Sequence, residues 1–283
     1  MKLAYSSEEL KKTANDIRIN IVESIHCGGS GHPGGSLSIA EMMAVLYFHE
    51  MDVDEKNPKW EDRDRFVLSK GHAAPAYYAA LAERGYFDKE VLKTLRHIDS
   101  ILQGHPDMKK VPGVDMSTGS LGQGISAAAG MARFAKQTGK GFRVYSILGD
   151  GEIQEGQVWE AVMSAGHFKL DNLTAFLDNN DLQIDGRVGE VSSPYPIDEK
   201  FRAFGFEVFC CDGHDFAALE ETFQKVLKVT GKPAAIIAKT IKGKGVSYME
   251  DQVGWHGKAP NDEEYAQAMQ ELRAKMAELE AQA

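Results

Sequence analysis

Two short polar segments each follow an apolar run that is typical of a buried β-strand. Gly149-Asp150-Gly151 comes directly after FRVYSIL, and Asp178-Asn179-Asn180 comes directly after LTAFL. If these runs are parallel strands joined by the single helix between them, their carboxyl ends bring Asp150 and Asn180 to one edge of the sheet. Carboxylate and amide oxygens suit Mg²⁺, and glycines let a phosphate approach the backbone closely. The sequence therefore predicts a site for a metal ion and a diphosphate, although a Gly-Asp-Gly tripeptide alone is usually only a turn.

Histidine is the second residue type whose placement suggests chemistry. Four of the nine histidines lie in glycine-rich segments: His32 in SGHPGG, His72 in SKGHA, His105 in GHP and His256 in GWHG. One such histidine would usually cap a turn, but four of them beside a diphosphate motif favour proton transfer and hydrogen bonding to a ligand rich in hydroxyl groups. The other five are expected to be structural, with His214 at a turn or cap and the rest within helices: His26, His49, His97 and His167.

The elements that must position these residues begin with three helices. Ser6 and Glu9 form a capping-box pattern before a helical repeat of apolar residues that ends at Gly28-Gly29. A second helix is expected over about residues 38–50, with Ser38 and Glu41 as its capping box. A third is expected from about residue 73 to Gly85.

Farther along the chain, strands alternate with helices. Apolar runs at residues 142–148, 173–177, 206–209 and 234–238 predict strands, and residues 156–168, 198–204 and 216–229 predict helices. This alternation predicts an α/β fold, with a parallel sheet flanked by helices on both faces. We expect one domain over residues 1–283, with a helical tail over about 261–283. That tail is either a solvated terminal helix or a helix that packs on another subunit.

Composition limits the kind of partner. A formal net charge of −10 argues against a nucleic-acid partner, which would require a basic surface. No apolar run approaches the length that spans a bilayer, and residues 1–7 lack a signal-peptide pattern, so we expect a cytoplasmic protein without a membrane partner. Cys27, Cys210 and Cys211 show no metal spacing and are expected to be packing residues.

The motifs together resemble those of transketolases. SGHPGG, DRFVLSKGHAAP, GHP, STGSLGQG, GDGEIQEG, IKGKGVSYME and WHGK occur in the order found in the N-terminal part of that family, and they cover nearly the whole chain. The resemblance implies the thiamine diphosphate-binding fold, with thiamine diphosphate and Mg²⁺, or Ca²⁺ or Mn²⁺, as cofactors. It also implies a transferase of carbohydrate metabolism, of the pentose phosphate type.

The resemblance further assigns roles to matching residues. Asp150, Asn180 and the main-chain oxygen of Leu182 are the implied metal ligands, with Asn179 as the competing choice for the asparagine. Glu155, in the first turn after the Gly-Asp-Gly segment, matches a glutamate thought to link two active sites across a subunit interface, but it is equally an ordinary acid at a helix N-terminus. The implied catalytic histidines are His32, His105 and His256. The implied cofactor-binding residues are Lys70, His72, Gly119, Ser120, Leu121, Asp150, Gly151, Glu152, Asn180, Lys242 and His256.

A transketolase chain of the usual kind is about twice as long and continues into pyrimidine-binding and C-terminal domains. No glutamate here matches the one that activates the pyrimidine of the cofactor. The resemblance therefore implies a split enzyme, in which this N-terminal subunit pairs with a C-terminal transketolase subunit, as an α₂β₂ assembly. Together they would transfer a two-carbon ketol unit from a ketose phosphate to an aldose phosphate, and this chain would be active only with its partner.

Two other functions remain open at this point. The chain could belong to another split thiamine diphosphate enzyme, such as a deoxyxylulose-phosphate-type synthase or a 2-oxoacid dehydrogenase, although the four histidines argue against this. It could also be a homologue that binds the cofactor without catalysis, although the intact Asp150, Asn180 and histidine set argues against decay.

Overall fold

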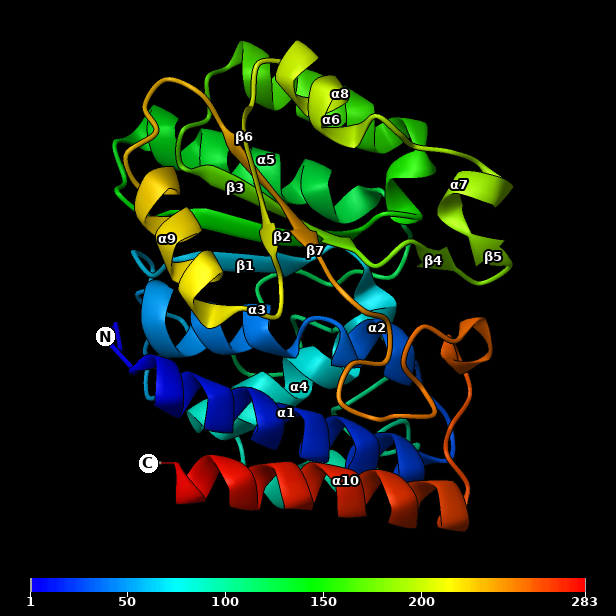
Figure 1. Cartoon of the computed structure of the whole chain (residues 1–283). Helices are drawn as coiled ribbons and strands as arrows, with labels where there is room; N and C mark the ends of the chain where they lie inside the picture. Colours follow the sequence, from blue (N-terminus) through cyan, green and yellow to red (C-terminus); the bar gives the residue numbers. More distant parts are fainter. Residues whose placement is uncertain (1, 283) are drawn as a thin grey trace.

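The computed structural model describes residues 2–282 and has a central parallel sheet of five strands (Figure 1). The strand order is β1-β2-β3-β7-β6, and all neighbouring pairs are parallel. The strands are β1 (Arg65–Leu68), β2 (Val144–Gly149), β3 (Leu173–Asn179), β6 (Glu207–Asp212) and β7 (Ala234–Lys239). The α/β prediction is confirmed, and so is the prediction that the two strands before the polar segments are neighbours. β1, which lies within the DRFVLSK segment, was not predicted as a strand.

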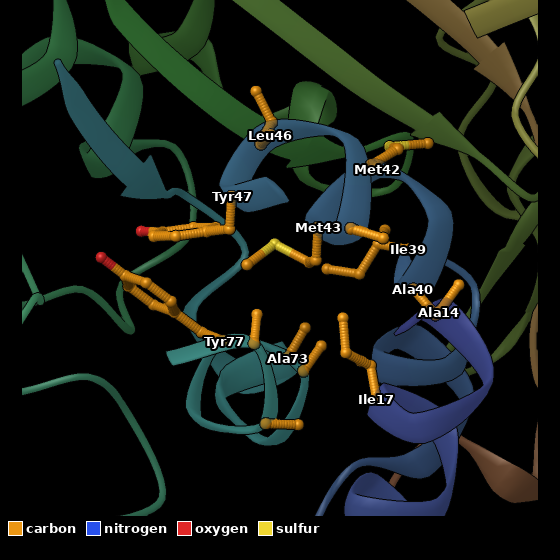
Figure 2. Close-up of a cluster of buried hydrophobic side chains, with 14 of the residues drawn as sticks. Ala14, Ile17, Ile39, Ala40, Met42, Met43, Leu46, Tyr47, Ala73 and Tyr77 are labelled. Atoms are coloured by element: carbon orange, nitrogen blue, oxygen red, sulfur yellow. The ribbon is translucent and has the colours of Figure 1, made fainter. Parts of the chain in front are cut away.

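Helices cover both faces of the sheet, and each face has its own apolar core (Figure 1). One face packs on α5 (Gln123–Thr138), α6 (Gly156–His167) and α8 (Ile197–Ala203). The other face packs on a larger layer: α1 (Ser7–Gly28), α3 (Ala40–Val45), α4 (Ala74–Arg84) and α9 (Phe216–Val226). Figure 2 shows the centre of this larger layer, where Met43 of α3 lies above Ile17 of α1 and the Tyr77 ring of α4 lies beside Tyr47.

The second predicted helix is confirmed over most of its length, but its start differs from the prediction. Helical structure runs without a break from Ala40 to Glu50, where α3 continues directly into a π-helical turn, Leu46–Glu50; a separate short helix, α2 (Pro33–Leu37), precedes it. The Ser38 side chain does not cap the N-terminus of α3. Its hydroxyl donates instead to Asp178 Oδ2 at 2.7 Å, at the end of β3. The expected capping box at Ser38 is wrong because a residue far away in the sequence takes up the hydroxyl.

The C-terminal helix packs on the first helix of the same chain. α10 (Asp262–Ala281) lies beside α1, and the two run in opposite directions (Figure 1). The Asn15 amide of α1 donates to the Leu272 carbonyl at 2.9 Å, and the His26 ring stacks on Tyr265 with 4.1 Å between centroids. Ala268, Met269 and Leu272 of α10 are buried there. The tail is therefore not a fully solvated helix, and this buried face is not available to another subunit.

Several smaller expectations also need correction. His97 lies in a loop and not in a helix, since the preceding helical turn ends at Thr94. Cys27 and Cys210 are exposed, so they are not packing residues, whereas Cys211 is half-buried. No helix among residues 2–282 is long and apolar enough to cross a membrane.

Candidate active site

A cavity of about 320 Å³ opens at the carboxyl edge of the sheet, next to the ends of β2, β3 and β7. Segments that lie far apart in the sequence converge there. The glycine-rich segments allow this convergence: a Cβ atom at Gly71 would lie 2.6 Å from the backbone nitrogen of Gly119, so only glycine lets these two loops touch. The predicted site residues that line the cavity are Lys70, His72, Leu121, Asp150, Gly151, Glu152, Glu155, Asn180, Leu182, Lys242 and His256.

Asp178, at the end of β3, organises the floor of this cavity. Its fully buried carboxylate accepts from Lys70 Nζ at 2.6 Å and from Asn180 Nδ2 at 2.7 Å. The hydroxyls of Ser38 and Thr240 donate to it as well. Although burial opposes ionisation, Lys70 and these donors hold the pKa of Asp178 below its usual value. Sequence reasoning gave this aspartate no role, and only its position next to the two asparagines marked it.

The three predicted metal ligands lie around one end of the cavity. Asp150 is buried, and its carboxylate accepts from the backbone nitrogens of Gly151, at 2.9 Å, and Asp181, at 2.5 Å. Burial, with the nearby charge of Asp178, raises the pKa of Asp150 to about 6. Leu182 directs its carbonyl toward the Lys242 ammonium at 3.1 Å. The set thus offers a carboxylate, an amide oxygen and a backbone carbonyl oxygen. The carbonyl oxygen of Leu182 already accepts a hydrogen bond from the Lys242 ammonium.

The structure distinguishes the two candidate asparagines. Asn180 lines the cavity, and its Oδ1 accepts from the Leu182 nitrogen at 3.0 Å. Asn179 instead uses its amide to donate to Asp150 and to the Tyr195 hydroxyl, both at 3.1 Å. Asn180 is therefore the better placed of the two to reach a ligand.

Three of the four predicted histidines form a compact cluster. The ring centroids of His32 and His72 are 5.2 Å apart, those of His72 and His256 are 5.2 Å apart, and those of His32 and His256 are 5.5 Å apart. Burial and the nearby positive charges lower all three pKa values, to about 4 for His32 and to about 3 for His256. The cluster is therefore neutral at pH 7, and each ring offers one donor and one acceptor.

One tautomer in this cluster follows from its neighbour. Lys242 Nζ lies 2.9 Å from His256 Nδ1. Burial, with the nearby charge of Lys70, lowers the pKa of Lys242 to about 8, so the amine is still mainly an ammonium at pH 7 and can only donate. His256 Nδ1 must then accept, which leaves the ring hydrogen on Nε2 as a donor.

His105 lies apart from the cluster, on the open side of the site. The side chain is exposed, and a Cβ atom at Gly119 would lie 3.0 Å from its ring. Arg96 lies nearby: its guanidinium is 3.4 Å from His32 Nδ1 and donates to Ser30 Oγ at 3.1 Å. Sequence reasoning missed Arg96, because a lone arginine in a loop carries no motif.

Two exposed apolar side chains and an exposed glutamate lie at the mouth of the cavity. Of the predicted loop Gly119, Ser120 and Leu121, only Leu121 lines the cavity; Leu121 and Ile184 expose 37% and 62% of their surface. Glu155 is exposed at the start of α6 and caps no backbone group with its side chain. Glu152, by contrast, is buried and holds the site together: it accepts from Ser69 Oγ at 2.5 Å and from the Gly122 and Gly149 nitrogens at 3.0 Å each.

Comparison with known proteins gives consistent matches. Residues 9–279 match the family described as transketolase, thiamine diphosphate binding domain. The chain is 47% identical to the 6-deoxy-6-sulfo-D-fructose transketolase subunit of Clostridium sp. (strain MSTE9), over 93% of this chain and 96% of that protein. It is 41% identical to an apulose-4-phosphate transketolase subunit from Actinobacillus succinogenes, over 95% of this chain and 97% of that protein.

Solved structures give the same result for the fold. Transketolase from Campylobacter jejuni superposes with a TM-score of 0.89 at 32% identity, and the match covers 97% of this chain but 46% of that one. The chain thus spans about half the length of that transketolase. Because the family match extends over most of its residues, the chain belongs to the transketolase family and has the fold of its thiamine diphosphate-binding domain.

Proposed function

We propose that residues 1–283 form one domain that acts as the N-terminal subunit of a two-subunit transketolase. The subunit binds thiamine diphosphate and Mg²⁺, and with a C-terminal subunit it transfers a two-carbon ketol unit from a ketose phosphate to an aldose phosphate. The observation that carries the proposal is that one cavity joins the Asp150, Asn180 and Leu182 oxygens to a cluster of neutral histidines.

The residues around the cavity fit the cofactor and its metal. Asp150, Asn180 Oδ1 and the Leu182 carbonyl supply hard oxygen ligands for Mg²⁺, whose charge would stabilise the buried Asp150 carboxylate. The Lys242 ammonium and the Gly151 backbone suit a diphosphate. When bound, thiamine diphosphate supplies the electron-withdrawing chemistry that breaking and forming the ketose C–C bond requires.

The histidines of this chain would bind and orient the sugar. His256 presents its Nε2 hydrogen as a donor, and the neutral His32 ring beside it offers one donor and one acceptor. His105, on the open side, would meet the part of the substrate that lies farther out. Neutral rings suit this role, since they bind hydroxyl and carbonyl groups of the substrate and can exchange protons with them.

The partner is proposed from two observations. Both relatives named as subunits match this chain over at least 96% of their own length. The mouth of the cavity also exposes apolar Leu121 and Ile184 beside Glu155, which is suitable for contact with a pyrimidine-binding domain. We propose an α₂β₂ assembly in which that domain closes the cavity.

The test is two-carbon transfer by the purified chain alone and then with a stoichiometric C-terminal subunit. Activity is expected only in the mixture. A ketose phosphate, 6-deoxy-6-sulfofructose and apulose 4-phosphate should be compared as donors, because the subunit relatives differ in the sugar they are named for. Robust turnover by the chain alone would contradict the two-subunit proposal. Transfer from pyruvate in place of a ketose would indicate another thiamine diphosphate enzyme, and cofactor binding with no turnover would indicate a non-catalytic homologue.

Alanine at His32, His105 or His256 is expected to lower kcat/KM for the ketose donor by roughly 10²- to 10³-fold, the usual effect of losing one well-placed donor to a developing negative charge. His256→Ala should also weaken cofactor binding, because its ring contacts Lys242. Steady-state kinetics with the assembled enzyme measures the loss. His167→Ala, at the end of α6, is the control and should be neutral. Wild-type kinetics in all three variants would leave these histidines with structural roles only.

A further inference from the structure

A chain of buried polar contacts joins α1 to the loop that follows β7. Arg18 Nη2 of α1 donates to both carboxylate oxygens of Glu41 in α3, at 2.6 Å each. Glu41 Oε2 lies 3.0 Å from His214 Nδ1, and the Ile241 backbone nitrogen lies 2.9 Å from His214 Nε2. The His214 side chain is only 12% exposed. It therefore bridges two elements and is more than the turn residue expected from the sequence.

The contacts assign the hydrogen on the His214 ring. A backbone N–H can only donate, so Nε2 must accept from Ile241 and carries no hydrogen. Burial alone would raise the pKa of Glu41, but the Arg18 guanidinium and the contact with His214 lower it to about 2. The carboxylate is therefore ionised at neutral pH and can only accept hydrogen bonds. Nδ1 must then carry the hydrogen and donate to Glu41. Both partners require the same neutral tautomer.

The backbone held by His214 carries side chains of the proposed cofactor site. On one side of Ile241, the Thr240 hydroxyl donates to Asp178. On the other side, Lys242 donates to the Leu182 carbonyl and faces His256. The loop is also fixed by backbone bonds at its ends: Thr240 N donates to Asn179 O at 3.2 Å, and Gly243 N donates to Gly34 O at 2.9 Å. The Ile241 amide between these ends is held by the His214 side chain.

We propose that His214 is a positioning residue, whose Nδ1-protonated ring fixes the loop at Ile241 and so sets the place of Lys242 in the cofactor cavity. The proposal rests on the proposed function, because the importance of Lys242 depends on the cavity binding thiamine diphosphate. His214 itself does not line the cavity, so it acts only through the loop.

The tautomer can be measured directly, whatever the protein catalyses. Ring ¹⁵N chemical shifts distinguish a nitrogen that carries hydrogen from one that does not, and the His214→Gln variant assigns the signal. We expect His214 to have hydrogen on Nδ1 and none on Nε2 at pH 7.5. Hydrogen on Nε2, or a doubly protonated ring, would overturn the proposal.

The positioning role is tested with two variants of His214, one that can keep the bond to the Ile241 amide and one that cannot. A glutamine reaches as far as Nε2 and can still accept from Ile241 N, whereas an asparagine reaches only as far as Nδ1 and leaves that buried amide without an acceptor. In the full chain assembled with its partner, His214→Asn is expected to weaken Mg²⁺-dependent thiamine diphosphate affinity by about 10- to 100-fold. His214→Gln should stay within about 3-fold of wild type.

A stability control separates positioning from general damage. Asn15→Ala removes a buried bond between α1 and α10, which is not one of the bonds that hold His214 or Ile241. It should lower the melting temperature without changing cofactor affinity. If His214→Asn also lowered only the melting temperature, the positioning role would be wrong while the proposed function stood. If wild-type complex failed to bind thiamine diphosphate, the proposed function would fall and this inference with it.

Discussion

Replacing Asp150 by alanine is expected to abolish Mg²⁺-dependent binding of thiamine diphosphate. Asp150 is the charged member of the proposed ligand set, and the other two oxygens come from an amide and a backbone carbonyl. Without it, the metal loses its strongest attraction, and the diphosphate charge is poorly neutralised. Isothermal titration of the assembled complex, with and without Mg²⁺, measures the effect.

The neighbouring residues provide controls for this result. Asn180→Ala should weaken binding in the same direction, whereas Asn179→Ala should weaken it less, because Asn179 contacts Asp150 but does not line the cavity. Asp198→Ala removes an exposed carboxylate of α8 and should bind like wild type. Unchanged affinity in both Asp150→Ala and Asn180→Ala would show that the metal binds elsewhere.

Lys70→Met is expected to destabilise the cofactor-free protein by about 3 kcal/mol or more, since it leaves a buried carboxylate without its cation. The Lys70 and Asp178 side chains are only 3% and 0% exposed, and their charged atoms are 2.6 Å apart. Asp178 keeps its hydrogen bonds from the Ser38 hydroxyl and the Asn180 amide. We therefore expect a loss at the lower end of the range for broken buried ion pairs. Urea denaturation without cofactor or metal measures the change in the free energy of unfolding.

The matched control is Lys136→Met. Lys136 pairs with Asp171 at a similar 2.7 Å, but the two side chains are 37% and 29% exposed. Solvent screens this pair, so its loss should cost about 0–1 kcal/mol. Similar losses in the two lysine variants would mean that burial adds nothing to the Lys70–Asp178 pair.

Much of the fold was predictable because its signals are local. Short apolar runs bounded by turn residues located β2, β3, β6 and β7, and the single helix between β2 and β3 correctly made them neighbours. The capping box at Ser6 and the glycine at residue 29 fixed both ends of α1. The family predicted from the motifs is confirmed by the match over residues 9–279.

The misses arise where a distant residue determines the local structure. The helix expected over residues 38–50 begins only at Ala40, and the Ser38 hydroxyl that was expected to cap it bonds Asp178, which lies 140 positions away. No local pattern indicates that β7 lies between β3 and β6. The same reason explains which site residues could be predicted. Sequence motifs pointed to Asp150 and the histidines, whereas Asp178 and Arg96 reach the site through contacts with Lys70 and His32 that form only on folding.

The antiparallel pair of α1 and α10 has a consequence for the order in which this protein folds. The bond between Asn15 and the Leu272 carbonyl spans 257 positions, so it forms only after nearly the whole chain has left the ribosome. Until then the face of α1 that will hold Met269 and Leu272 stays open to solvent. Contacts of such long range slow folding, and incomplete chains with open apolar faces tend to aggregate. During synthesis, the open face of α1 would therefore be a surface that a chaperone could shield.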